Sequence, residues 1–159
     1  MKKTIFITGA TDGIGLETAK LLAAQGHNLL VHGRSPEKLA HVKGQLSGIS
    51  KNGLTETWVC DLSKMDHVQG MAASITANQT KLDVLINNAG VFRAPTPVTR
   101  DGLDVRFAVN AIAPYLLTQE LLPLLGPSGR VINLSSAAQA PVDLKALAGR
   151  ERLSQGGAY

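Results

Sequence analysis

The chain has 159 residues, 44% of them apolar and 18% charged, a length and composition that predict one globular domain able to fold without disulfides or metal ions. Its single cysteine, Cys60, excludes an internal disulfide framework, and the Cys and His residues lack zinc-ligand spacing, so we expect no metal and a reducing, cytoplasmic location. The net charge of +4 comes from scattered basic residues, and the apolar runs are short, so we expect neither a nucleic-acid surface nor a signal peptide or membrane span.

The predicted elements alternate between short strands and longer helices. In chain order they are a strand over residues 4–7, a helix over 13–25, a strand over 29–32, a helix over 36–45, a strand over 55–60, a helix starting at Ser63, a strand over 82–86, a helix over 103–122 and a strand over 130–134. This alternation is typical of a parallel sheet with right-handed crossovers. The sequence therefore predicts an α/β fold, a doubly wound parallel Rossmann sheet in three α/β/α layers, forming a single domain over residues 1–159.

Three local signals define helix boundaries. Ser35 has the position of an N-cap, with Pro36 at the first helical position. The run from Ser63 to Asp66 matches a capping box at the start of the third helix. Pro114 lies inside the long fourth helix and should interrupt and bend it, because proline has no backbone N–H.

The first strand leads directly into a glycine-rich turn, Thr8 to Gly15, that opens the first helix. Gly9 permits a tight turn, Gly13 lets the backbone approach a pyrophosphate, and Gly15 lets the helix pack closely on the strand. The N–H groups at the helix N-terminus favour a phosphate there. No Lys-Ser/Thr pair follows, which excludes a P-loop, and a simple structural turn remains the alternative.

Further motifs follow the later strands. Asp61-Leu62 comes after the third strand, Asn87-Asn88-Ala89-Gly90 after the fourth, Asn110 lies within the long helix, and Asn133 to Ser136 follows the fifth strand. With the G-x-x-x-G-x-G spacing of the glycine turn, this set resembles the short-chain dehydrogenase/reductase family. The resemblance implies an oxidoreductase that transfers a hydride between a nicotinamide dinucleotide and a small carbonyl or alcohol substrate.

The end of the second strand bears on the choice of cofactor. The sequence there is His32-Gly33-Arg34-Ser35, without the acidic residue that usually holds the ribose of NAD. Arg34 can form a forked contact with the 2′-phosphate of NADP. We therefore predict NADP, with NAD as the alternative, because Asp12 stands where some NADP-preferring relatives carry a basic residue and Arg34 can also be a solvated loop residue.

The resemblance assigns the cofactor contacts residue by residue. Asp61 would accept a hydrogen bond from the adenine amino group while Leu62 packs on the ring, although Asp61 can also cap the turn at Ser63. The segment after the fourth strand would line the ribose and also stabilise the sheet. The predicted contacts are Gly9, Thr11, Asp12, Gly13, Ile14, Gly15, Arg34, Asp61, Leu62, Asn88, Ala89 and Gly90.

The resemblance also implies the catalytic groups. Tyr159 would be the general acid/base, Ser136 would orient the substrate oxygen, and Asn110 would hold the active-site lysine through a water. A free phenol is only about 0.1% ionised at pH 7, so the tyrosine needs a nearby cation. The family places that lysine four residues after the tyrosine, and this sequence stops at Tyr159. Ser136 as a turn residue and Asn110 as a backbone-bonded helix residue are the structural alternatives.

The segment between Ser136 and Tyr159 is longer than in many relatives and is similar to the retinol dehydrogenase-like branch. The competing interpretation is a regulatory module of the same fold that binds a dinucleotide without catalysis, and an epimerase of the extended branch is less favoured. A homodimer is expected from the resemblance alone.

The fold needs at least six strands in the order 3-2-1-4-5-6, and the sequence supplies five. We therefore expect the chain to lack the last strands of its domain and its fifth strand to be an exposed apolar edge. For His27, His32, His41 and His67 we expect surface or loop positions, and for Cys60 a place in the core.

Overall fold

Strands and helices alternate from the N-terminus to β5 in a computed structural model that describes residues 1–137, 141–154 and 156–157. The strands are β1 (Thr4–Ile7), β2 (Asn28–Gly33), β3 (Thr55–Val59), β4 (Val84–Asn87) and β5 (Arg130–Asn133). The helices are α1 (Gly13–Ala24), α2 (Pro36–Ile49), α3 (Met65–Asn78), α4 (Val105–Phe107), the π-helical turn η1 (Ala108–Ile112), α5 (Ala113–Leu125) and α6 (Leu144–Leu147). Most predicted bounds are therefore correct to within a few residues.

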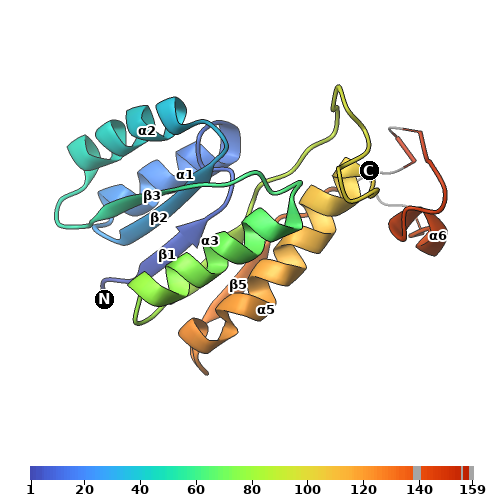
Figure 1. Cartoon of the computed structure of the whole chain (residues 1–159). Coiled ribbons are helices and arrows are strands. Elements are labelled where there is room, and N and C mark those ends of the chain that lie inside the picture. The colour runs from blue at the N-terminus through green and yellow to red at the C-terminus, as the bar shows by residue number, and fades with distance from the viewer. Residues whose placement is uncertain (138–140, 155, 158–159) are drawn as a thin grey trace.

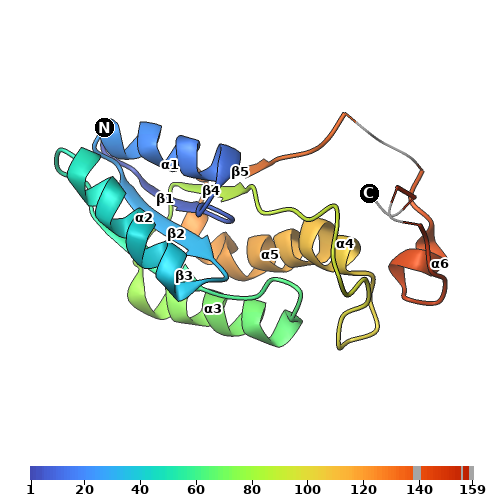
Figure 2. The same cartoon turned by 90° about the horizontal axis from the view of Figure 1, so that it is seen from above.

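The strands form one parallel sheet in the order β3-β2-β1-β4-β5. Helices α1 and α2 cover one face of the sheet, and α3 and α5 cover the other (Figures 1 and 2). The chain crosses from β3 back over to β4 beside β1, so that the strand order reverses direction next to β1. This arrangement confirms the predicted doubly wound Rossmann sheet with helices on both faces.

Alternate side chains of each strand enter opposite cores. Phe6 of β1 packs with Leu30 and Leu85 of its neighbours in the cluster under α3 and α5. The flanking Ile5 and Ile7 enter the second cluster, which lies under α1 and α2. Because both faces are covered, the strands consist of nearly continuous Val, Ile and Leu runs, as parallel strands usually do.

The helix boundaries test two of the capping predictions. The Ser35 hydroxyl oxygen accepts a hydrogen bond from the backbone N–H of Lys38 at 3.2 Å, which confirms it as the N-cap of α2. The capping box at Ser63 is wrong, because α3 begins at Met65 and has no side-chain cap. The Ser63 hydroxyl instead donates to Asp61 Oδ1 at 2.8 Å, so a local turn after β3 takes the group that a cap would need.

The long fourth helix is not a single bent α-helix. Its place is taken by α4, the π-helical turn η1 and then α5. Pro114 occupies the first turn of α5, where its missing N–H costs little. The Thr118 hydroxyl donates to the Pro114 carbonyl at 2.7 Å. The interruption was predicted, but its form, one wide turn centred on Asn110, was not.

Strand β5 lies at the edge of the sheet and pairs only with β4 within the part of the chain that the structure describes. Ile132 is 45% exposed and Leu134 is 43% exposed, so the predicted apolar edge is present. Along the described ranges, the helices are all too short or too polar to cross a bilayer.

Candidate active site

The glycine turn after β1 is shaped by contacts that only glycine tolerates. Gly9 has φ +65°, and a Cβ there would lie 2.8 Å from the Cα of Ala89. A Cβ on Gly15 would lie 2.3 Å from the carbonyl oxygen of Gly9. Gly13 differs, since it has φ +53° but nothing within 4 Å of its Cβ position. The geometry matches the predicted tight turn at Gly9, close packing at Gly15 and open backbone at Gly13.

A hydrogen-bond network joins the ends of β1 and β4. The Asn88 side-chain amide donates to the carbonyl oxygens of Thr8 at 2.9 Å and Gly9 at 3.0 Å. In return, the backbone N–H groups of Asn88 and Ala89 donate to the Thr8 hydroxyl at 3.1 and 3.0 Å. The segment after β4 therefore fixes the start of the glycine turn through hydrogen bonds, in agreement with its predicted part in stabilising the sheet.

A cavity of about 750 Å³ opens along the carboxyl ends of β1, β2 and β3, the edge where ligands bind in doubly wound sheets. Every predicted cofactor residue lines this cavity, which we call the dinucleotide pocket after that prediction. These residues are Gly9, Thr11, Asp12, Gly13, Ile14, Gly15, Arg34, Asp61, Leu62, Asn88, Ala89 and Gly90.

Two of these side chains have structural contacts of their own. Asp12 is the N-cap of α1, and its Oδ1 accepts from the Gly13 N–H at 2.8 Å. Leu62 is buried in the core under α3 and α5, so its main contacts are with protein.

Asp61 serves a turn as well as lining the pocket. Its Oδ1 accepts hydrogen bonds from the backbone N–H of Ser63 at 3.1 Å and from the Ser63 hydroxyl. Burial acts to raise the pKa of Asp61, but the bonds from Ser63 and the charges of Lys64 and Arg34 outweigh it, so the pKa lies below its usual value. Asp61 is thus a carboxylate held by its own loop at the mouth of the pocket.

Two basic residues of the dinucleotide pocket lie where β2 ends, and a third, Arg93, lies in the loop after β4. Arg34 follows β2 directly, and Lys38 lies in the first turn of α2. Lys38 was missed from the sequence, although it lies four residues after Arg34, in the first turn of the helix that Ser35 caps. Among the described residues, no cluster of three or more His, Cys, Asp or Glu side chains is placed to hold a metal ion.

His32 is the clearest error of the sequence interpretation. It was expected at the surface or in a loop, but it is 2% exposed inside the end of β2. Its Nδ1 accepts from the Gly9 N–H at 3.2 Å, and its Nε2 lies 3.0 Å from the Cys60 carbonyl oxygen. Burial is the main cause that lowers its pKa to about 4. Cys60 is buried as predicted, and burial raises its pKa to about 11, so its thiol stays protonated at neutral pH.

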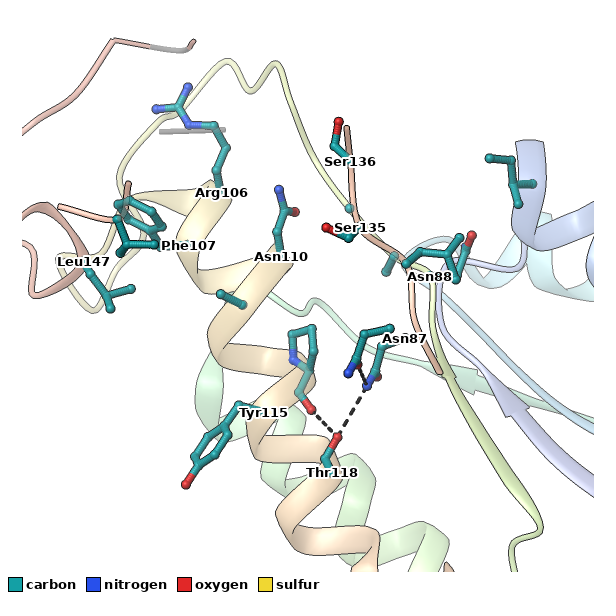
Figure 3. A pocket seen from close by; sticks show the side chains of 18 residues that line it. Asn87, Asn88, Arg106, Phe107, Asn110, Tyr115, Thr118, Ser135, Ser136 and Leu147 are labelled. Atoms are coloured by element: carbon teal, nitrogen blue, oxygen red, sulfur yellow. Dashed lines mark hydrogen bonds between the residues drawn. The ribbon is translucent and has the colours of Figure 1, made fainter. Parts of the chain in front are cut away.

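A second cavity, of about 840 Å³, lies between η1 and the segment after β5 (Figure 3). Asn110 reaches it from η1, and Ser136 faces it from the opposite side. The two cavities share Ile14, which is 71% exposed, and the segment from Asn88 to Gly90. The structure thus brings Asn110 and Ser136 together beside the dinucleotide pocket. Tyr159, the third predicted catalytic residue, lies outside the described residues.

Asn110 is fixed by the backbone of the loop after β4. Its Oδ1 accepts from the Val91 N–H at 2.8 Å, and its Nδ2 donates to the Val91 carbonyl at 2.9 Å. This matches the structural alternative for Asn110, a side chain bonded to neighbouring backbone. Its position in a π-helical turn is notable because such turns recur at functional sites.

The floor of the second cavity is polar. Asn87 Nδ2 donates to Asn133 Oδ1 at 2.8 Å and contacts the Thr118 hydroxyl at 3.4 Å (Figure 3). Arg106, 2% exposed, forms an ion pair with Asp104 at the other end of the cavity. Asn87 and Asn133 belong to the predicted motifs after β4 and β5, but their contacts with each other and with Thr118 were not predicted, because they join three separate elements. The Arg106–Asp104 pair was not predicted either.

A family model for short chain dehydrogenases matches residues 3–145 of the sequence. The chain belongs to this family. It is 39% identical over 138 residues to retinol dehydrogenase 13 of Homo sapiens, an alignment that covers 86% of this chain and 42% of that protein. It is 36% identical over 161 residues to retinol dehydrogenase 12 of Mus musculus, covering 99% of this chain and 51% of that protein.

Solved structures agree with the family. A metagenomic short-chain oxidoreductase in complex with NADP superimposes with a TM-score of 0.77 at 32% identity, covering 99% of this chain and 67% of that chain. The chain spans about half the length of the curated relatives it matches. The predicted resemblance to the retinol dehydrogenase-like branch agrees with these matches.

Proposed function

We propose that this protein is an NADP(H)-dependent oxidoreductase that transfers a hydride between the nicotinamide and the carbon of a small carbonyl or alcohol substrate. The observation that carries the proposal is the junction of the two cavities at Ile14. One cavity is lined by every predicted dinucleotide contact, and the other by Asn110 and Ser136. The cytoplasm as location and a homodimer as assembly are part of the same proposal and rest on composition and family.

The dinucleotide pocket fits such a cofactor. The space at Gly13 is open, whereas Gly9 and Gly15 are tightly packed, so a phosphate could approach the start of α1, where it would compete with Asp12 for the Gly13 N–H. Arg34 and Lys38 would hold the 2′-phosphate that distinguishes NADP from NAD. When bound, the nicotinamide supplies the hydride chemistry, and the chain supplies binding and proton transfer.

The contributions of the protein follow from where its side chains lie. Ser136 would donate a hydrogen bond to the substrate oxygen and orient it in the second cavity. Tyr159 would give or take the proton at that oxygen, as the family resemblance implies. Asn110 would position the wall of the pocket, since the oxygen and the nitrogen of its side-chain amide already bond to the backbone of Val91.

Binding measurements test the cofactor. NADPH and NADH titrations should show tighter NADPH binding by the wild type, and Arg34→Ala should weaken NADPH by about tenfold or more while leaving NADH nearly unchanged. Lys43→Ala, which removes one charge from the exposed side of α2 outside the pocket, is the matched control. Equal losses for both dinucleotides would refute a 2′-phosphate contact at Arg34.

Turnover tests the chemistry. With a panel of carbonyl and alcohol substrates, nicotinamide absorbance should change with the wild type, and Ser136→Ala should lower kcat about a hundredfold with the NADPH affinity retained. Ser128→Ala, in the exposed turn before β5, is the matched control. Tight NADPH binding without any turnover by the wild type would instead support the regulatory, non-catalytic module.

A further inference from the structure

One buried side chain connects the glycine turn to the end of β3. His32 projects from β2, which lies between β1 and β3 in the sheet. Its ring accepts from the Gly9 N–H on one side and reaches the Cys60 carbonyl on the other. Gly9 begins the turn that would face the phosphates in the proposed function, and Cys60 precedes Asp61, the residue that would contact the adenine. The two ends of the dinucleotide pocket are therefore joined through one imidazole.

The partners of the ring define its protonation state. The Gly9 N–H is a donor, so Nδ1 must carry a lone pair, and the Cys60 carbonyl is an acceptor, so Nε2 must carry the proton. Only the neutral ring with its proton on Nε2 satisfies both partners. The charged groups that act on the ring are Arg34, which disfavours its protonation, and Asp61, which favours it.

Gly9 is held from several directions at once. The Asn88 amide holds its carbonyl oxygen, and Gly15 packs against that same oxygen. The adjacent Ala10 N–H donates to the His32 carbonyl at 2.9 Å. The ring of His32 supplies the remaining contact, on the Gly9 N–H. Removing the ring would therefore free the Gly9 N–H, while the backbone bond from Ala10 to β2 and the Asn88 contact would remain.

We propose that His32 is a positioning residue of the dinucleotide site, whose neutral imidazole fixes the glycine turn relative to the Cys60–Asp61 segment. This inference rests on the proposed dinucleotide binding and adds a residue that lines the dinucleotide pocket and whose two ring nitrogens are both engaged with backbone. An apolar residue of similar size would fill the same space, but it would leave the Gly9 N–H and the Cys60 carbonyl unpaired in the core. The ring thus acts on affinity through backbone order, and it serves NADPH and NADH alike.

The test compares two substitutions. His32→Leu removes both hydrogen bonds, whereas His32→Gln retains an acceptor and a donor in one planar group. His32→Leu should weaken NADPH and NADH by a similar factor, about tenfold, and His32→Gln should restore most of the affinity. This common loss separates His32 from Arg34, which should discriminate between the two dinucleotides. His41→Leu, on the exposed side of α2, is the matched control.

Two measurements on the protein without cofactor complete the test. Nitrogen NMR of the wild type should show the Nε2-protonated neutral ring, and amide exchange at Gly9 should be faster in His32→Leu than in the wild type. Unchanged dinucleotide affinity in a folded His32→Leu overturns the inference. If that variant does not fold, either of two other results overturns the inference. One is an Nδ1-protonated ring in the wild type. The other is a dinucleotide affinity of His32→Gln that is about tenfold or more below that of the wild type, as expected when both hydrogen bonds are lost. Failure of the wild type to bind either dinucleotide overturns the proposed function instead.

Discussion

Acidification should destabilise this protein through His32 before its carboxylates respond. Burial is the main cause that lowers the pKa of His32 from 6.5 to about 4, and the charge of Arg34 adds to it. The hydrogen bond to the Cys60 carbonyl and the charge of Asp61 act in the opposite direction but are smaller in effect. The folded protein therefore keeps this ring neutral at pH values where the unfolded chain protonates it.

The size of the effect follows from linkage. Above the unfolded pKa of 6.5 the ring is neutral in both states and contributes no pH dependence. As the pH falls from there toward 4, only the unfolded state gains the proton, so the free energy of unfolding decreases by about 1.4 kcal/mol per pH unit. Across the full window the loss is about 3 kcal/mol, a large part of a typical domain's stability.

Urea unfolding between about pH 7 and pH 4 measures this loss, with His32→Gln as the matched variant, since glutamine does not titrate. The wild type should lose about 3 kcal/mol relative to His32→Gln across the window. Asp61 and Asp83 have pKa values below 3.8, and their stabilising effect is lost only as the pH falls through those lower values. Parallel stability profiles for the two proteins would refute a buried neutral His32.

Three further predictions concern local geometry. Gly15→Ala must displace the Gly9 carbonyl, 2.3 Å from the new Cβ, and should cost about 2–3 kcal/mol in urea unfolding. Gly13→Ala meets no atom and should cost only about 1 kcal/mol for its positive φ, so equal losses would contradict the packing argument. Asn110→Ala removes two hydrogen bonds to the loop after β4 and should lower the free energy of unfolding by about 2 kcal/mol, with faster amide exchange in that loop. Unchanged exchange would contradict the role of Asn110 in holding the loop. Ser35→Ala should cost about 1 kcal/mol by removing the cap of α2, whereas Ser47→Ala on the same helix should be nearly neutral in thermal unfolding.

The glycine turn could be predicted from sequence because its constraints are local. β1 ends at Ile7 and α1 starts at Gly13, six residues later, which leaves the backbone few paths, and these paths require glycine at Gly9 and Gly15. The polar residues after β3, β4 and β5 were also predicted, because parallel strands bring their carboxyl ends to one edge. The sequence therefore predicts which residues lie at this edge of the sheet.

The contacts among those residues depend on pairs distant in the chain. His32 bonds to Gly9 and Cys60, which are 23 and 28 positions away, and neither partner contributes a side chain that a motif would show. Before α3, Ser63 is the residue type expected at an N-cap, but its hydroxyl donates to Asp61 instead of capping the helix. A local sequence pattern therefore does not predict hydrogen bonds to distant backbone groups, nor an acceptor that competes with a cap.

Asn110 shows what this omission means for function. Sequence and family place an asparagine in the helix beside the second cavity, and the π-helical turn presents it there. Its side-chain oxygen and one of its two N–H donors already bond to Val91, so the side chain holds the loop after β4. The same is true of Asn88, whose amide holds the glycine turn. Asn88 and Asn110, both residues of the family motifs, thus shape the cavities by fixing backbone.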